Sequence, residues 1–365
     1  MPDKKQLNIA MIGSGFIARA HSNAFHQVGR FFEIPYTLDL KVVCGRNQPK
    51  LQAFASQWGW AETVADWREV IDRKDVDVID IAVPNALHAP ITMAAAKAGK
   101  MIFCEKPLAI SLTEARAMAG AVKDLPNLVW FNYRRVPAVA FARQMITEGK
   151  LGKVYHYRSY YFNQSGVDPA KGHTWRYRAG EAGSGAIGDL LSHSIDMATY
   201  LNSDITELSA MKHTFVPGRE VDDAVSAMVR FGNGSLGTFE ASRFGVGRRN
   251  GIGFEIYAEK GSLAFDLEDM NRLRFYDATE PANLQAYRNI LVTGPDHPYW
   301  ANFWKPAHLI GYEHSFIATL GDFLENLAGG EPFHPNFQDA VQIQGVLEAV
   351  EASANTKTWI RLKSK

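Results

Sequence analysis

The segment Gly13-Ser-Gly15-Phe-Ile-Ala18 constrains the fold of this chain more than any other. It follows a short apolar run at 7–12 that is typical of a buried strand, and it opens a run at 16–28 that is typical of a helix. Gly13 permits a tight turn, and Gly15 lets backbone amides approach a phosphate without an intervening side chain. The N-terminus of the helix adds unpaired N–H groups and a partial positive charge. These features predict a pyrophosphate site made by Gly13, Ser14, Gly15, Phe16 and Ile17. The alternative is a glycine turn in an α/β domain that binds no nucleotide.

The first third of the chain alternates between strand-like and helix-like runs. Further strands are expected at 40–44, 76–83, 101–104 and 128–131, and helices at 49–58, 66–71, 90–98 and after Ser111. Asp66 and Ser111 are the expected helix N-caps. This alternation predicts a parallel sheet with both faces covered. Residues 28–39, which contain several aromatic side chains, are expected to form a long connection, either an insertion near the cofactor or a surface loop.

The pattern changes near residue 150, and we predict domains at 1–133 and 134–365. Strand candidates dominate the second half and occur at 153–162, 208–215, 224–231, 234–241, 253–258, 261–266 and 273–276. Two of the intervening segments, 231–235 and 259–262, carry hairpin-turn residues. Helices are expected at 185–201, 312–328 and 337–354, and the last two can pack back on the first domain.

The composition excludes several classes of protein. Lys+Arg and Asp+Glu both total 39, so the net charge argues against a broad nucleic-acid-binding face. The sequence contains no run of about 18 apolar residues, and its start carries no apolar signal region, so we expect no membrane span. The cysteines, Cys44 and Cys104, are expected to be buried free thiols in a reducing compartment, which points to the cytoplasm.

The end of the second strand bears on the choice between NAD and NADP. An acid at this point binds the ribose 2′-hydroxyl of NAD, whereas an arginine accommodates the 2′-phosphate of NADP. The segment here is Cys44-Gly45-Arg46-Asn47, which contains no acid and favours NADP. The alternatives are that Arg46 stacks on the adenine while Asn47 binds ribose, or that Arg46 is a solvated loop charge.

Three further segments, taken with the glycine turn, resemble the glucose–fructose oxidoreductase and inositol dehydrogenase family (Gfo/Idh/MocA). They are Pro84-Asn85-Ala-Leu-His88, Glu105-Lys106-Pro107, and Gly183-Ser-Gly185-x-x-x-Asp189-x-x-x-His193-x-x-Asp196. The chain departs from the family pattern in Ser184, where a third glycine is usual, and in Leu191-Ser192 before the histidine.

The resemblance implies an α/β protein with an N-terminal Rossmann domain and a C-terminal α+β domain built on a large, open, mainly antiparallel sheet. It also implies oxidation or reduction of a sugar, inositol or anhydrosugar with NAD(P), in a homodimer or homotetramer. The cofactor-binding residues expected beyond the glycine turn are Gly45, Arg46, Pro84, Asn85, His88, Glu105, Lys106, Asn132 and Arg134.

Lys106, His193 and Asp189 are the predicted catalytic residues. Lys106 follows a strand of the parallel sheet, at the edge where ligands gather, and Pro107 restricts its backbone. The resemblance implies that Lys106 hydrogen-bonds the reacting hydroxyl, with Glu105 beside the nicotinamide. If 185–201 is helical, Asp189, His193 and Asp196 lie on one face. His193 can then take the hydroxyl proton while the carbon gives up a hydride. This hypothesis requires Lys106 and His193 to face the same nicotinamide ring.

Aromatic and polar side chains suit the two kinds of surface on a sugar ring. The predicted substrate-binding residues are Lys106, Tyr133, Trp175, Arg176, Asp189, His193 and His297. A metal hydrolase is disfavoured because the histidines are scattered, and we predict no metal site. Two alternatives keep the fold: an NAD-retaining glycosidase that oxidises, eliminates and reduces, and a catalytically silent dinucleotide-binding sensor.

Overall fold

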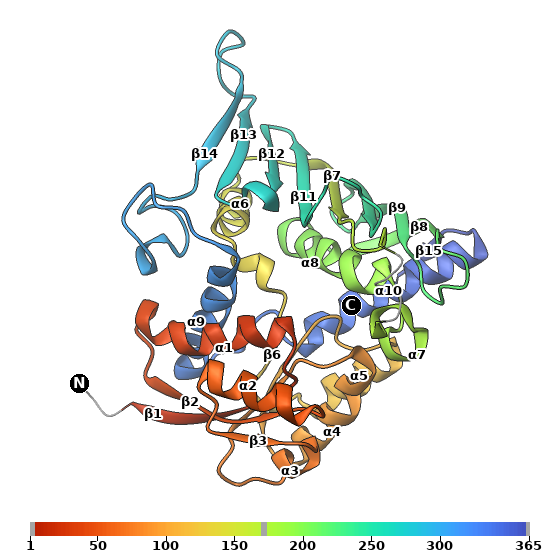
Figure 1. The fold of residues 1–365 in the computed structure, drawn as a ribbon. Helices are drawn as coiled ribbons and strands as arrows, with labels where there is room; N and C mark the ends of the chain where they lie inside the picture. Colours follow the sequence, from red (N-terminus) through yellow and green to blue (C-terminus); the bar gives the residue numbers. More distant parts are fainter. Residues whose placement is uncertain (1–3, 169–173, 363–365) are drawn as a thin grey trace. The chain divides into compact units, whose positions relative to one another are not determined.

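The computed structural model describes residues 4–168 and 174–362 of the chain (Figure 1). It divides into two compact units, Met1–Asn132 with Gly311–Gln342, and Tyr133–Ile310 with Ile343–Lys365. The prediction made each domain a single continuous segment, whereas each unit of the structure consists of two segments.

The first unit is built on a six-stranded parallel sheet with strand order β3-β2-β1-β4-β5-β6. Its strands are β1 (Lys5–Ile12), β2 (Tyr36–Cys44), β3 (Glu62–Val64), β4 (Val78–Ile81), β5 (Met101–Cys104) and β6 (Asn127–Val129). Its helices are α1 (Phe16–Phe31), α2 (Gln48–Trp58), α3 (Trp67–Ile71), the short η1 (Asn85–Leu87), α4 (His88–Lys97), α5 (Leu112–Ala121) and α9 (Tyr312–Gly329). All four residues of β4 are buried, so both faces of the sheet are covered at its centre. This is the Rossmann arrangement that the alternating pattern predicts.

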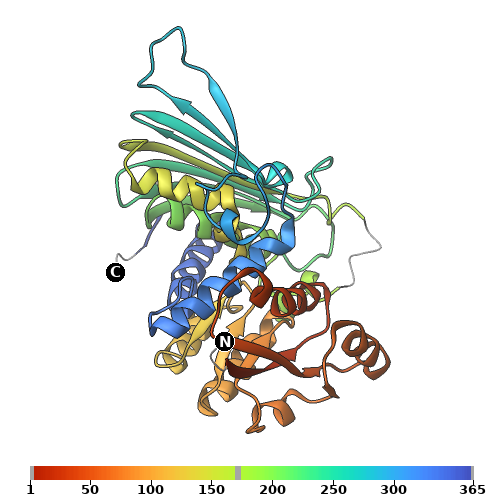
Figure 2. The ribbon, with the colours of Figure 1, turned by 90° about the vertical axis from the view of Figure 1, so that its left-hand side faces the viewer.

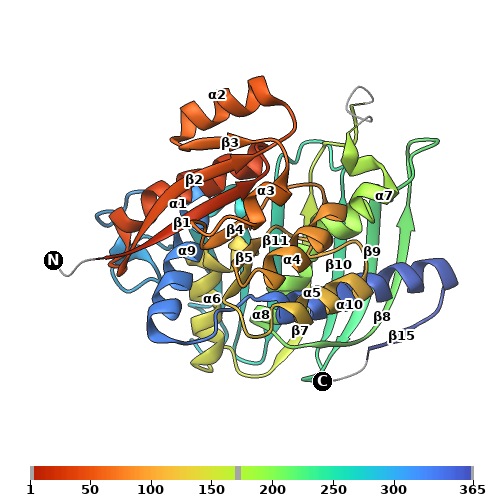
Figure 3. The ribbon, with the colours of Figure 1, turned by 90° about the horizontal axis from the view of Figure 1, so that it is seen from below.

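Local capping residues set several of these helix boundaries. The side chain of Asp66 accepts from the backbone N–H of Arg68 at the start of α3, and Ser111 accepts from the N–H of Glu114 at the start of α5. Both N-caps are as predicted, because a short polar side chain satisfies an N–H that has no partner within the helix. Helices α4 and α5 lie side by side in this unit (Figure 3).

The long connection predicted at 28–39 is wrong. Helix α1 continues to Phe31 and β2 begins at Tyr36, so only residues 32–35 connect them. Phe31 and Tyr36 lie in α1 and β2, and Phe32 in the short connection is buried. The ring of Phe32 lies against Gly321 of α9, where an added Cβ would come within 2.5 Å of the ring. A helix from the far end of the chain therefore completes the layer beside α1.

The second unit contains a nine-stranded sheet with order β14-β13-β12-β11-β7-β10-β9-β8-β15. Its strands are β7 (Val154–Phe162), β8 (Ile205–His213), β9 (Ala224–Phe231), β10 (Leu236–Ser242), β11 (Gly251–Ala258), β12 (Gly261–Asp266), β13 (Arg272–Asp277), β14 (Tyr287–Leu291) and β15 (Ile360–Arg361). The β7–β10 pair is parallel and the other described pairs are antiparallel. The hairpins predicted at 231–235 and 259–262 join β9 to β10 and β11 to β12, as expected. Strand β14 was not predicted.

Helices α6 (Pro137–Thr147) and α8 (Ser192–Leu201) pack on one face of this sheet (Figure 2). The other described helices are η2 (Asn132–Arg135), η4 (Trp175–Tyr177), α7 (Ala179–Ala182), η5 (Ile187–Leu191), η6 (Leu267–Asp269), η7 (Trp300–Asn302) and α10 (Phe337–Thr356), of which η2 and α10 begin in the first unit and continue into the second. The strand registers place four large apolar side chains together on the opposite face of the sheet. These side chains are 40–72% exposed, and they are Met211, Met228, Leu236 and Tyr257.

The helix predicted at 185–201 differs from expectation at its start. Residues Ile187–Leu191 form a π-helical turn, and the α-helix α8 begins at Ser192. The carboxylate of Asp222 anchors this turn because it accepts from the backbone N–H groups of Gly185 (2.7 Å) and Ile187 (2.9 Å). A Cβ at Gly185 would lie 1.7 Å from the carbonyl oxygen of Asp222, so no larger residue fits there. Because a π turn is wider than an α turn, the simple i, i+4 relation between Asp189 and His193 does not hold.

The two cysteines are buried and free, as predicted. Burial raises the pKa of the Cys44 thiol to about 12 and that of Cys104 well above its usual range. Neither thiol is therefore a nucleophile at neutral pH. None of the described helices combines the length and apolarity that a membrane crossing requires.

Candidate active site

The glycine turn between β1 and α1 has the geometry of a phosphate cradle. Gly13 has φ +122°, and a Cβ at this position would lie 2.1 Å from the carbonyl oxygen of Ala82. Only glycine fits there. A Cβ at Gly15 would meet no atom within 4 Å, so the N-terminus of α1 is open to a ligand. A Cβ at Gly45 would lie 3.4 Å from the hydroxyl of Ser14, so the predicted residues after β1 and β2 lie together.

The residues after β2 fill different roles. Arg46 is exposed. The side-chain oxygen of Asn47 accepts from the N–H of Lys50 at 3.2 Å and caps α2. The side-chain oxygen of Asn47 is thus engaged in the helix cap, whereas its amide nitrogen can still donate to a ligand.

His88 joins two of the strand-end loops. Its Nε2 lies 3.0 Å from the carbonyl oxygen of Val83, and its Nδ1 lies 3.1 Å from that of Pro107. The ring is fully buried, and burial lowers its pKa despite these carbonyl contacts. A neutral ring has one N–H, so one of the two contacts lacks a proton. His88 therefore braces the loop that carries Pro84 and Asn85 against the loop that carries Lys106.

Glu105 and Lys106 follow β5 at the carboxyl edge of the sheet. The backbone N–H of Glu105 donates to the carbonyl of Ile81, which continues the sheet pairing by one residue. The carboxylate of Glu105 is 7% exposed and accepts from the backbone N–H of Lys106 at 3.2 Å. Asn132 is also buried, and its amide donates to the hydroxyl of Ser315 at 2.7 Å.

A buried charge cluster below Glu105 was missed from the sequence. His21 of α1 lies between Asp80 of β4 (2.8 Å) and Glu105 (3.1 Å). The indole N–H of Trp130 donates to the second oxygen of Asp80 at 3.0 Å. Two signals could have revealed the cluster. His21 lies on the buried face of α1, three residues from Ala18, and Asp80 interrupts an apolar strand.

In the second unit, His193 lies among polar aromatic side chains. The ring is 5% exposed, and its centroid lies 4.7 Å from that of Tyr133 and 5.9 Å from that of Tyr161. Asn250 connects the two tyrosines because its Oδ1 accepts from Tyr161 at 2.6 Å and its Nδ2 donates to Tyr133 at 3.3 Å. Tyr161 and Asn250 were not predicted, since strand alternation alone does not tell which face of β7 meets α8.

Asp189 and Asp196 each contact a different arginine. The guanidinium of Arg243, which is 1% exposed, donates to Asp189 at 3.0 Å and to the carbonyls of Arg176 and Gly185 at 3.3 Å. Arg134 forms a buried two-pronged ion pair with Asp196. Arg134, predicted to bind cofactor, thus uses its charge within the unit. Arg243 was missed from the sequence, as one of many arginines with no motif around it.

The remaining predicted substrate residues lie on loops and a short helix. Trp175 and Arg176 are on η4, with the Arg176 guanidinium 4.7 Å from the indole centroid. The Nδ1 of His297 accepts from the N–H of Gly294 at 2.9 Å, so its proton is on Nε2, and burial lowers its pKa.

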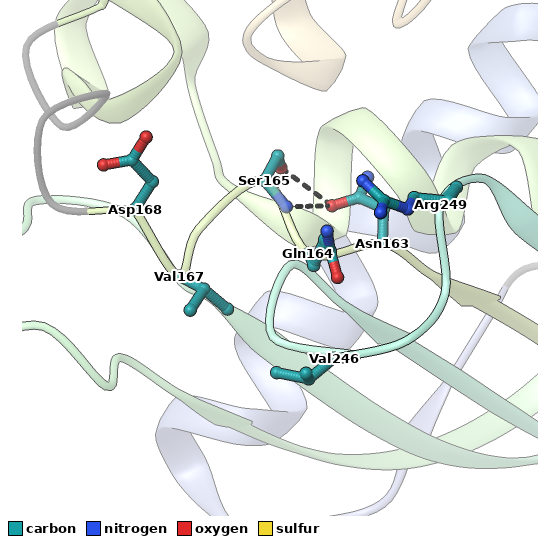
Figure 4. Close-up of a pocket in the computed structure, with 7 residues that line it drawn as sticks. All are labelled: Asn163, Gln164, Ser165, Val167, Asp168, Val246 and Arg249. Carbon is teal, nitrogen blue, oxygen red and sulfur yellow. Dashed lines mark hydrogen bonds between the residues drawn. The ribbon is translucent and has the colours of Figure 1, made fainter.

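A surface cavity of about 450 Å³ lies beyond the end of β7 (Figure 4). Its lining residues are Asn163, Gln164, Ser165, Val167, Asp168, Val246 and Arg249. None of the predicted site residues lines it. Among the described residues, no three His, Cys, Asp or Glu side chains gather as a metal site would require.

Comparison with known proteins agrees with this geometry. Residues 7–133 match the family model "Oxidoreductase family, NAD-binding Rossmann fold", and residues 139–264 match the "GFO/IDH/MocA C-terminal domain" model. The chain is 38% identical to a levoglucosan dehydrogenase of Pseudarthrobacter phenanthrenivorans over 98% of each chain.

Solved structures give the same result. An oxidoreductase domain protein from Kribbella flavida is 43% identical with a TM-score of 0.96, covering 99% of this chain and 100% of that one. A levoglucosan dehydrogenase in complex with NADH and levoglucosan is 39% identical with a TM-score of 0.95, covering 98% of this chain and 100% of the other. The chain belongs to the Gfo/Idh/MocA family of NAD-binding oxidoreductases. The predicted family, fold class and enzyme class are confirmed.

Proposed function

We propose that this protein oxidises a hydroxyl-bearing carbon of a sugar or anhydrosugar, with levoglucosan as the first substrate to test. The observation that carries this proposal is the full-length likeness to levoglucosan dehydrogenase, at a TM-score of 0.95 for the complex with NADH and levoglucosan. Relatives at lower identity are named for glucose 6-phosphate, scyllo-inositol and apiose, so the substrate class is polyhydroxylated throughout.

The residues of the first unit fit a dinucleotide. The turn at Gly13 accepts no side chain, and the N-terminus of α1 is open beyond Gly15, as pyrophosphate binding requires. When bound, the nicotinamide supplies the hydride acceptor. We propose that Gly13, Ser14, Gly15 and the loops after β2, β4 and β5 hold this cofactor.

The proposed catalytic residues manage the proton and the position of the substrate. His193 takes the hydroxyl proton, Lys106 hydrogen-bonds the hydroxyl oxygen, and Asp189 orients a neighbouring hydroxyl. Tyr133, which lies against the His193 ring, contributes an aromatic wall. Trp175, Arg176 and His297 are proposed substrate contacts.

Purified protein and a panel of levoglucosan, inositols and hexoses test this proposal, with NADH formation read at 340 nm. His193→Ala and Lys106→Met should each lower kcat by about 10²–10⁴, and each should reduce turnover much more than NADH affinity. His213→Ala and Lys97→Met are matched controls because both side chains are exposed.

Near-normal turnover by either active-site variant would refute the catalytic assignment. A wild type that oxidises nothing in the panel would refute the function. Cleavage of a glycoside with copurified cofactor and no net NADH would instead indicate the NAD-retaining glycosidase.

We propose NAD as the cofactor, because the similar levoglucosan dehydrogenase structures contain NADH. The preference for NADP suggested by Arg46 stays a prediction. Titration of wild type and Arg46→Ala with both cofactors decides between them. Tighter binding of NADP, lost in the variant, would overturn the proposal for NAD.

We also propose a homodimer or homotetramer that uses the open face of the second sheet. The support is the row of exposed apolar side chains at Met211, Met228, Leu236 and Tyr257. Sedimentation of wild type and Met228→Glu tests it, and a monomeric wild type would refute it. The free buried thiols support a reducing, cytoplasmic location.

A further inference from the structure

The buried cluster of Asp80, His21 and Glu105 is not used by the proposed mechanism. His21 has no exposed surface, and both of its ring nitrogens face carboxylates, Nδ1 at 2.8 Å from Asp80 and Nε2 at 3.1 Å from Glu105. An ionised carboxylate only accepts hydrogen bonds, so both ring nitrogens must carry protons to make both contacts. The geometry is therefore that of an imidazolium held between two anions.

The surroundings of the ring favour this charged form. Trp130 stacks on His21 at 4.2 Å between centroids, and Phe316 of α9 lies at 5.5 Å. Burial by itself lowers the pKa of His21, but the charges and hydrogen bonds of Asp80 and Glu105 outweigh it and raise the pKa to about 9. His21 is thus protonated at neutral pH.

Two other titratable groups adjoin the cluster. Cys104 at the end of β5 is kept as a neutral thiol by burial and by the charges of Glu105 and Asp80. His88 is kept neutral by burial, although the charge of Glu105 acts in the opposite direction. His21 is therefore the cation that balances the two buried carboxylates.

Glu105 connects this cation to the proposed active site. One of its oxygens faces His21, and the other accepts from the backbone N–H of Lys106 at 3.2 Å. The carboxylate is thus held at both ends, and its orientation determines where the backbone of Lys106 can lie.

We propose that His21 is a positioning residue for the dehydrogenase reaction, which as an imidazolium orients Glu105 and through it the backbone of Lys106. This inference rests on the proposed function, because it assumes that Lys106 acts on the substrate. His21, which is fully buried, acts through Glu105 and touches neither substrate nor cofactor itself.

Two substitutions at His21 separate its two contacts. An Asn amide reaches the position of Nδ1 and can still donate to Asp80, whereas a Gln amide reaches the position of Nε2 and can still donate to Glu105. His21→Asn should lower kcat by about 10- to 100-fold, the scale expected when a reacting group is misplaced by about 1 Å. His21→Gln should retain more of the wild-type kcat than His21→Asn. Substrate KM and NADH Kd should change little in either variant.

His26→Asn and His26→Gln are the matched controls. His26 is on the same helix, and its Nε2 lies 2.7 Å from the carbonyl oxygen of Trp58 rather than against a carboxylate. Both control variants should keep the wild-type kcat. Thermal midpoints of all four variants show how much stability each substitution removes.

Asp80→Asn tests the same inference at the other carboxylate that contacts His21. Asp80 is fully buried in β4 and contacts His21 and Trp130, so it can change kcat through His21 from a position that no substrate reaches. This variant should lower kcat with NADH Kd unchanged. It keeps the inference falsifiable if the His21 variants do not fold.

A purely structural role predicts lower thermal midpoints with an unchanged kcat in the folded protein. That result in His21→Asn, or in Asp80→Asn, would overturn the inference. Equal kcat loss in His21→Asn and His21→Gln would overturn the route through Glu105. An inactive wild type would refute the proposed function, whereas an active wild type with unaffected variants refutes the role of His21 alone.

Discussion

The ion pair between Arg134 and Asp196 is expected to be among the costliest contacts to break. The Nε of Arg134 lies 3.0 Å from each oxygen of Asp196, and its Nη2 lies 2.6 Å from Oδ1. The side chains are 10% and 2% exposed. The Asp196 charge also adds to burial in raising the pKa of the Tyr157 hydroxyl. The structure therefore holds a buried anion that is paired with a guanidinium.

Replacing Arg134 by Met removes the guanidinium and leaves the Asp196 carboxylate buried without this ion pair. Breaking a buried pair from one side typically costs about 3–5 kcal/mol. At about 2–4 °C per kcal/mol for a unit of this size, the thermal midpoint should fall by roughly 10 °C. The double variant Arg134→Met/Asp196→Leu removes both charges and should recover most of the loss, because the desolvation cost disappears with them.

Calorimetric scans of wild type, both single variants and the double variant measure this coupling. Arg158→Met is the control, because Arg158 pairs with Glu255 on the exposed side of the sheet and should cost less than about 1 kcal/mol. If Arg134→Met costs no more than Arg158→Met, or if the double variant is the least stable of all, the reasoning is refuted.

Three further outcomes are expected. Gly13→Ala should weaken NADH binding, because the added Cβ would meet the carbonyl oxygen of Ala82 and strain the turn by about 1–3 kcal/mol. Fluorescence titration with NADH measures this change, and an unchanged affinity would contradict the phosphate cradle at Gly13. Arg243→Met should raise the substrate KM by roughly tenfold or more, since Asp189 loses a charged hydrogen bond of about 1.5–3 kcal/mol; an unchanged KM would remove Asp189 from the substrate contacts. The pKa of His21 is about 9 in the folded protein against 6.5 for the free side chain, so its contribution of about 3 kcal/mol is complete below pH 6.5 and is lost as pH rises through 9. The difference in free energy of unfolding between wild type and His21→Gln should therefore decrease as pH rises from 6.5 to 9. A difference that stays constant over this range would contradict a charged His21.

The parallel sheet was predictable because its signals are local. Apolar runs, N-caps such as Asp66 and Ser111, and the glycine turn each occupy a few adjacent residues, and the structure confirms them. The extent of α1 was not predictable in the same way. Helix α1 packs against α9, which lies about 290 residues later in the chain, and Phe31 in its last turn lies against His314 of α9, a contact that a local pattern does not reveal.

The candidate site likewise contains residues that local motifs reveal and residues that only the folded structure brings together. Lys106 and His193 were found from motifs, and their roles stay predictions. Arg243 and Asn250 carry no motif, and only the pairing of distant strands brings them to Asp189 and Tyr161. His21 and Asp80 can be noticed in the sequence as polar residues at positions expected to be buried. Their contact cannot be predicted in this way, because it depends on how α1 crosses the sheet.

At the π-helical turn Ile187–Leu191, the number of residues determines the direction of the Asp189 side chain as much as the residue types do. Removing one residue there would restore an ordinary α-helix and swing Asp189 by about 100° relative to His193. A relative shortened by one residue could keep every side chain named here and still present a different carboxylate, or none, to Arg243. When family members are aligned across this stretch, a single gap therefore says more about the direction of the Asp189 side chain than several substitutions do.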